Sequence, residues 1–112
     1  MVIESISVAA LSKLTTASRD ATVIDVRTPA EYMEVRSVVV SANIPLDQMS
    51  DETMASNGWG DKNQAYYLIC RSGARSMKAC EILSELGYKK LFNVTGGTNA
   101  WAQADLPVKS GS

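Results

Sequence analysis

The residues best suited to covalent chemistry lie together in one short segment, Cys70 to Ser76, which reads CRSGARS. A cysteine ends an apolar run there, and a polar loop with one glycine and two arginines leads into a predicted helix. The thiolate form of cysteine is the nucleophile, and positive charge together with a helix N-terminus lowers the pKa of a thiol below its free value of ~8.5. The segment therefore predicts a reactive cysteine at position 70.

The loop after Cys70 has the size and composition of an anion-binding loop. Successive backbone N–H groups that turn inward around one point form a nest for an anion, and Arg71 and Arg75 add positive charge. We expect the loop to hold a thiolate, a persulfide or a bound oxyanion. Cys80, by contrast, falls beside Leu83 on the apolar face of a predicted helix, which indicates an inert core thiol.

The composition excludes several other kinds of site and partner. The chain has no histidine, which excludes histidine triads, histidine metal sites and imidazole pH sensors. Lys and Arg number 11 against 12 Asp and Glu, a balance that argues against nucleic acid or an anionic membrane as the main partner. Residues 1–16 lack the pattern of a signal peptide, and no apolar run approaches the ~18 residues of a membrane span. We therefore expect a soluble cytoplasmic protein with free thiols.

The elements that would position Cys70 alternate between strand and helix. Apolar and β-branched runs predict strands over 2–6, 21–24, 65–69 and 91–94, with a short strand between 38 and 44. Helices are expected after Ser7, after Thr28 with Glu31 at capping-box spacing, weakly over 47–56, over 76–86 and over 99–104. This alternation favours an α/β fold with a mainly parallel sheet, in which ligand sites lie at the carboxyl ends of the strands. We expect one domain over residues 1–108 and a flexible C-terminal tail over 109–112.

Several short motifs follow one another along nearly the whole chain. They are Asp25-Val26-Arg27 with Glu31-Tyr32, then Asn43-Ile44-Pro45-Leu46, then Cys70 to Ser76, then Gly87-Tyr88, Gly96-Gly97 with Ala100-Trp101, and Leu106-Pro107. Each motif is weak alone, but in this order and spacing they resemble the single-domain rhodaneses, a family of sulfurtransferases.

The resemblance implies a five-stranded, mainly parallel sheet with helices on both faces. It implies that Cys70 is the catalytic nucleophile and carries sulfur as a persulfide. It further implies a substrate-binding loop whose backbone N–H groups surround the outer sulfur, made of Arg71, Ser72, Gly73, Ala74, Arg75 and Ser76. Asp25, Arg27 and Glu31 match positions that support the site from a neighbouring loop in this family.

One segment departs from the usual family pattern. The family has a Gly-His or Val-His step and then a Gly-Ala pair, whereas residues 35–42 carry Arg36 in place of the histidine and Ser41 in place of the glycine. Without glycine a loop adopts left-handed turns only at a cost, so the resemblance does not predict the conformation of this segment. Gly96 and Gly97 are interpreted as a tight turn, and Trp101 as a core residue.

The resemblance implies an enzyme that transfers sulfane sulfur from thiosulfate or a low-molecular-weight persulfide to cyanide or a thiol, without a cofactor or metal. Covalent transfer through Cys70 predicts ping-pong kinetics. A non-enzymatic persulfide carrier or signalling module that acts on a protein partner would also need Cys70 and stays open as an alternative. Phosphatases and arsenate reductases with a related loop need five residues between Cys and Arg, whereas four separate Cys70 from Arg75, which disfavours them.

Overall fold

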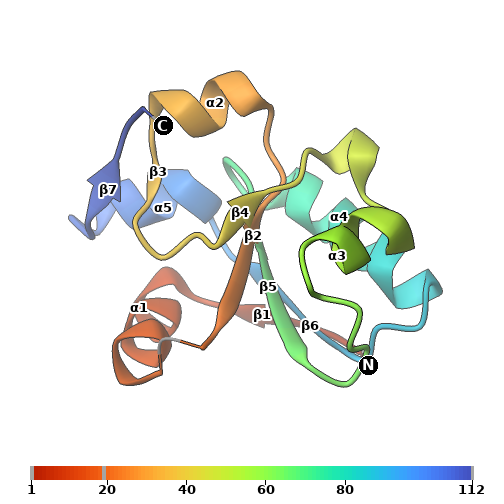
Figure 1. The fold of residues 1–112 in the computed structure, drawn as a ribbon. Coiled ribbons are helices and arrows are strands. Elements are labelled where there is room, and N and C mark those ends of the chain that lie inside the picture. Colours follow the sequence, from red (N-terminus) through yellow and green to blue (C-terminus); the bar gives the residue numbers. More distant parts are fainter. Residues whose placement is uncertain (1, 19, 112) are drawn as a thin grey trace.

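The computed structural model describes residues 2–18 and 20–111. The elements in chain order are β1 (Ile3–Ile6), α1 (Val8–Ala17), β2 (Thr22–Asp25), α2 (Pro29–Glu34), β3 (Arg36–Ser37), β4 (Ala42–Asn43), η1 (Leu46–Gln48), α3 (Asp51–Ser56), β5 (Ala65–Ile69), α4 (Ala74–Glu85), β6 (Lys90–Val94), α5 (Gly97–Gln103) and β7 (Val108–Lys109) (Figure 1).

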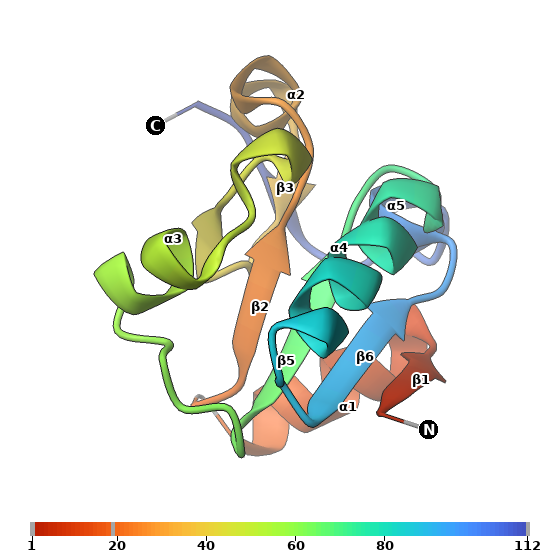
Figure 2. The ribbon, with the colours of Figure 1, turned by 90° about the vertical axis from the view of Figure 1, so that its right-hand side faces the viewer.

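The main sheet has five strands in the order β1-β6-β5-β2-β4, and all of its pairings are parallel. Figure 2 shows α4 against one face of this sheet and α1 behind the other. The predicted α/β fold, with helices on both faces of a parallel sheet, is therefore confirmed. The central strand β5 ends at Ile69, so the next residue, Cys70, lies at the carboxyl edge in the middle of the sheet.

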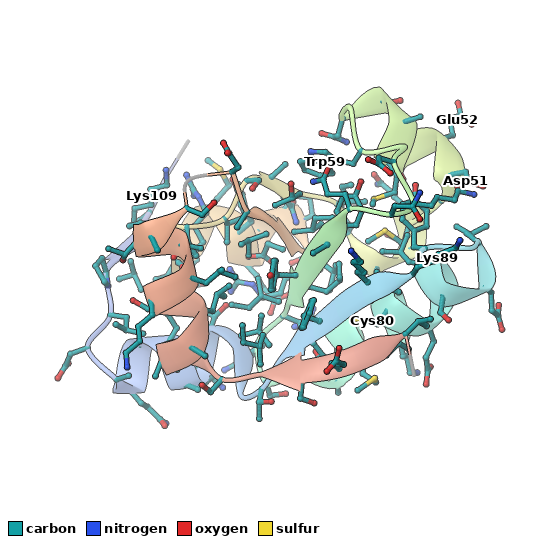
Figure 3. All side chains as sticks on the ribbon, turned by 90° about the horizontal axis from the view of Figure 1, so that it is seen from below. Asp51, Glu52, Trp59, Cys80, Lys89 and Lys109 are labelled. Atoms are coloured by element: carbon teal, nitrogen blue, oxygen red, sulfur yellow. The ribbon has the colours of Figure 1, made fainter. Side chains whose placement is uncertain are left out.

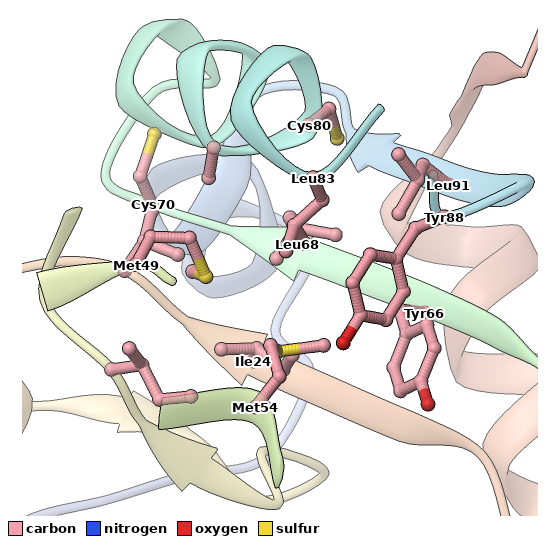
Figure 4. Packing of buried hydrophobic residues seen from close by; sticks show 13 residues of the cluster. Ile24, Met49, Met54, Tyr66, Leu68, Cys70, Cys80, Leu83, Tyr88 and Leu91 are labelled. Atoms are coloured by element: carbon pink, nitrogen blue, oxygen red, sulfur yellow. The ribbon is translucent and has the colours of Figure 1, made fainter. Parts of the chain in front are cut away.

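The alternation of side chains along β5 decides which way Cys70 points. Tyr66, Leu68 and Cys70 belong to the buried cluster on the α4 side of the sheet (Figure 4). Tyr67 and Ile69 belong to the cluster on the other side. Because successive side chains of a strand point to opposite faces, the sequence of β5 directs the thiol toward the N-terminus of α4.

The boundaries of two predicted helices differ from the structure near the site. The helix expected over 76–86 begins two residues earlier, at Ala74, because Gly73 takes the left-handed conformation (φ 112°) from which the helix starts. The helix expected over 99–104 likewise begins at Gly97, after the left-handed Gly96. Both helices therefore begin at the edge of the Cys70 loop. The weak helix expected over 47–56 divides into η1 and α3.

The atypical segment 35–42 folds without any left-handed residue, so it does not need the glycine that Ser41 replaces. Ser41 instead pairs with β2 through both of its polar groups: its N–H donates to the Val23 carbonyl (2.7 Å) and its Oγ accepts from the Val23 N–H (3.0 Å). Arg36 is buried, with its guanidinium 4.2 Å from the ring centre of Tyr32. It also donates hydrogen bonds to the carbonyls of Tyr32 and Gly111.

The C-terminal residues differ from the expected flexible tail. Val108 and Lys109 form β7, which pairs antiparallel with β3. The Gly111 N–H then donates to the Met33 carbonyl at 2.7 Å. The structured part of the chain thus continues through Gly111, while Ser112 lies outside the described residues. In the part of the chain that the structure describes, no helix is both long and apolar enough to cross a membrane.

Candidate active site

The Cys70 sulfur lies inside the loop that joins β5 to α4. Its side chain is almost fully buried, and Sγ accepts hydrogen bonds from the Gly73 N–H (3.0 Å) and from the Ser76 hydroxyl (3.3 Å). Gly73 can turn its N–H toward the sulfur because its φ of 112° is open to glycine at little cost. The loop therefore surrounds the sulfur with donors, as an anion-binding nest requires.

These donors change the acidity of the thiol. Burial of Cys70 disfavours the thiolate, but hydrogen bonds from the Ser76 hydroxyl and from the N–H groups of Ser76, Gly73 and Ser72 outweigh it and lower the pKa of the Cys70 thiol. Cys80 shows the opposite effect, because burial and the charge of Glu81 raise the pKa of its thiol to about 12. Figure 3 shows Cys80 among the interior side chains, where it has no exposed surface. Of the two free thiols, Cys70 is thus the nucleophile candidate.

A buried asparagine on β6 completes this network and was not predicted from the sequence. The Asn93 side chain accepts from the Ser76 hydroxyl at 2.5 Å and donates to the Gly73 carbonyl at 3.2 Å. A hydroxyl has one proton, so Asn93, the Cys70 sulfur and the Gly73 carbonyl, which lies 3.2 Å from the Ser76 oxygen, compete for it. The available signal was a polar residue in the apolar run Leu91 to Val94, on the strand that pairs with β5.

Arg75 in the first turn of α4 forms an ion pair with Glu31 in the first turn of α2. Its two terminal nitrogens reach the two Glu31 oxygens at 2.7 and 2.9 Å. Hydrogen bonding to Arg75, with a smaller contribution from Thr28, lowers the pKa of Glu31 to about 2 although partial burial opposes the shift. Glu31 therefore contacts Arg75 at the start of α4 and neutralises the positive charge that Arg75 was expected to add.

Asp25 and Arg27 form a buried pair beside the loop. Arg27 binds both Asp25 carboxylate oxygens at 2.8 to 3.1 Å and also donates to the Val35 carbonyl. The Asn43 amide donates to the carbonyls of Asp25 and Arg27. Neither charged side chain hydrogen-bonds to residues 70–76, all of which the structure describes. The pair holds the turn between β2 and α2, and α2 carries Glu31.

The start of α5 fixes the outer side of the Cys70 loop. The Thr98 N–H and hydroxyl donate to the Cys70 carbonyl, and the Asn99 N–H donates to the Arg71 carbonyl. A Cβ on Gly97 would lie only 2.3 Å from the Cys70 carbonyl oxygen, so only glycine permits this approach. These contacts turn the loop carbonyls outward and leave its N–H groups free for the sulfur. The glycines thus serve backbone geometry, and Trp101 is buried as predicted.

Some of the predicted site residues contact the Cys70 site, whereas the side chains of others are exposed. Gly73, Arg75 and Ser76 make the contacts described above, and Ser72 contributes its N–H. Ala74 begins α4 with an exposed side chain. The exposed Arg71 side chain lines a small polar cavity of about 170 Å³ together with Arg27, Glu31 and Glu34, among other residues. Among the described residues, no cluster of side chains could hold a metal ion.

Comparison with known proteins agrees with this geometry. The rhodanese-like domain family matches residues 7–104. The putative sulfurtransferase YtwF of Bacillus subtilis is 38% identical over 109 residues, which cover 96% of this chain and 98% of that protein. The thiosulfate sulfurtransferase PspE of Escherichia coli is 37% identical over 73 residues, covering 65% and 67%. The crystal structure of a rhodanese-like domain protein from Staphylococcus aureus, 32% identical, superposes with a TM-score of 0.72 and covers 88% of this chain and 90% of that one.

Proposed function

We propose, for a chain that belongs to the rhodanese-like domain family, that Cys70 accepts sulfane sulfur from a small donor and passes it to a thiophilic acceptor. The observation that carries the proposal is the convergence of the Gly73 N–H and the Ser76 hydroxyl on the Cys70 sulfur. The names of several relatives, including the thiosulfate sulfurtransferase PspE, support the same class of reaction. Thiosulfate and low-molecular-weight persulfides are the proposed donors.

The transfer takes two steps. The Cys70 thiolate attacks the outer sulfur of thiosulfate, a new S–S bond forms, and sulfite leaves with the electron pair of the old S–S bond. The persulfide now carries the negative charge on its outer sulfur, which the inward-facing N–H groups of the loop stabilise. Cyanide or a thiolate then attacks that sulfur and releases the Cys70 thiolate. No oxidant, metal or cofactor is needed for either step.

The nature of the acceptor distinguishes an enzyme from a persulfide carrier, because both would form the same intermediate on Cys70. Small acceptors such as cyanide and cellular thiols support the enzyme, while discharge only to a protein would support the carrier. Phosphatase chemistry is disfavoured by a second observation besides loop length. A phosphatase arginine binds the oxyanion directly, whereas both terminal nitrogens of Arg75 bind Glu31.

The test is intact mass spectrometry after exposure to thiosulfate or glutathione persulfide and removal of the excess donor. The protein should gain one sulfur atom and lose it on addition of cyanide, with thiocyanate formed. Cys80→Ser is the matched control and should keep the gain, because Cys80 is buried and its thiol pKa is raised to about 12. Cys70→Ser should lose it. Sulfur that remains on the Cys70→Ser protein would contradict the assignment.

A further inference from the structure

The larger cavity beside the Cys70 loop has a chemical character that thiosulfate does not match. It measures about 460 Å³, within the usual range for small-molecule sites, and lies between η1 and α4, from which Arg75 and Ile82 line it. Its apolar lining comes from Val26, Pro45, Leu46 and Ile82, and all of these except Val26 are only half-buried. Apolar side chains are therefore open to a ligand here.

Two residues connect this cavity to the reacting sulfur. Arg75 lines it and lies in the first turn of α4, directly after the loop that holds Cys70. Val26 lines it as well, packs in the same cluster as Cys70, and donates its N–H to the carbonyl of Ile69, the residue before Cys70. A molecule in this cavity would thus lie next to the loop that presents the sulfur.

The charges around the cavity do not suit a dianion. Arg75 is the cation in its lining, and Glu31 neutralises it. Asp47 adds a carboxylate to the lining and makes no ion pair within the described part of the chain. Thiosulfate carries two negative charges and has no apolar group, so it gains little from this surface.

We propose that this cavity binds the apolar substituent of an organic sulfur donor, so that the enzyme prefers alkyl or aryl sulfane donors to thiosulfate. The inference rests on the proposed sulfur transfer and assigns its donor class. With an alkanethiosulfonate, the Cys70 thiolate attacks the sulfane sulfur, the bond between that sulfur and the sulfonyl group breaks, and the alkanesulfinate leaves with the electron pair. The substituent stays in the cavity during this step, while the transferred sulfur enters the loop.

The first experiment compares alkanethiosulfonates from methane to hexane with thiosulfate, using cyanide as the common acceptor. In a ping-pong reaction the kcat/KM for the donor reports the first step alone. We expect kcat/KM to rise with chain length, by up to about fourfold for each methylene group that enters the cavity, and to exceed the value for thiosulfate. A value that does not change with chain length would overturn the proposal.

The second experiment assigns the effect to this cavity. Ile82→Asn should flatten the dependence on chain length, because it places an amide in the apolar lining. Leu14→Asn is the matched control: Leu14 is also a half-buried helical residue, but it packs on the opposite face of the sheet and should leave the dependence unchanged. Thermal unfolding verifies that both variants fold. If Ile82→Asn does not fold, Ile82→Ala replaces it, because this substitution shortens the same side chain.

The outcomes separate this inference from the proposed function. If no sulfane donor places sulfur on Cys70, the sulfur-transfer proposal itself fails. If thiosulfate places sulfur on Cys70 but chain length has no effect, or if Ile82→Asn and Leu14→Asn respond alike, only the donor class is wrong.

Asp47→Asn gives a further check, since removing this carboxylate should raise kcat/KM for thiosulfate by about twofold to fivefold. An unchanged value would contradict the charge argument.

Discussion

Both terminal nitrogens of Arg75 bind the carboxylate of Glu31, at 2.7 and 2.9 Å, and this pair ties the first turn of α4 to the first turn of α2. Glu31 also accepts from the Thr28 N–H and completes the capping box of α2. One carboxylate thus caps its own helix and holds the helix that follows the reactive cysteine. The sulfur is consequently stabilised by N–H and hydroxyl donors, while the nearby guanidinium has its own partner.

The Arg75–Glu31 pair predicts a pH-dependent contribution to stability. Because the pKa of Glu31 is about 2 in the folded protein against an ordinary 4.5, the contribution is fully present above pH 4.5 and is lost as the pH falls through 2. Glu31→Gln should lower the free energy of unfolding at pH 7 by about 0.5–1 kcal/mol, as expected for a partly exposed pair. Urea unfolding from pH 7 down to pH 2 should show the difference from the parent protein shrinking.

Glu34→Gln serves as the control for this measurement. Glu34 ends the same helix but forms no ion pair among the described residues. Its substitution should change the free energy of unfolding little at any pH. A Glu31→Gln difference that persists unchanged at pH 2 would show that the pair is not its source.

Ser76→Ala should raise the pKa of the Cys70 thiol. The substitution removes the hydroxyl that donates to Sγ and leaves the burial of the sulfur in place. The pH midpoint of alkylation by iodoacetamide should shift upward, and sulfur transfer at pH 7 should slow by about tenfold, which corresponds to one hydrogen bond to a charged group. Ser84→Ala, farther along the same helix, should leave the midpoint where it is.

Asn93→Ala should shift the same midpoint in the opposite direction. Asn93 competes with the sulfur for the single Ser76 proton, and its loss leaves the sulfur and the Gly73 carbonyl as acceptors, which raises the share of that proton donated to the thiolate. We expect alkylation below the midpoint to accelerate by about threefold, a fraction of one hydrogen bond. A shift in the same direction as Ser76→Ala would instead show that Asn93 acts mainly by anchoring the Gly73 carbonyl.

The parts of the site that could be predicted are those encoded by local sequence. The apolar run 65–69 placed Cys70 at the end of a buried strand, and Thr28 with Glu31 three residues later marked the start of α2. The short helix-starting loop after Cys70 was also predicted, although the helix begins two residues earlier than expected. Each of these features depends on residues within one turn or one strand of each other.

The parts that could not be predicted are contacts across strands. Glu31 meets Arg75 only because β2 and β5 are neighbours, and Asn93 meets Ser76 only because β6 lies on the other side of β5. Strand order follows from packing of the whole sheet and has no local signature. The burial of Arg36 is a similar case, since its partners include Gly111, 75 residues away.

Gly97→Ala should disturb both stability and sulfur transfer, because it acts on the backbone of the Cys70 loop. The new Cβ would lie 2.3 Å from the Cys70 carbonyl oxygen and 2.8 Å from the carbonyl carbon of Arg71, and the residue has a φ of 55°. Overpacking and the left-handed conformation together should cost about 2–4 kcal/mol in the free energy of unfolding.

Gly60→Ala is the matched control, since a Cβ there meets no atom within 4 Å, and it should change the free energy of unfolding by less than about 0.5 kcal/mol. Chemical unfolding measures both variants, and the rate of sulfur loading shows whether the loop still presents its N–H groups. Equal stability of the two variants would mean that the start of α5 does not hold the Cys70 loop in place.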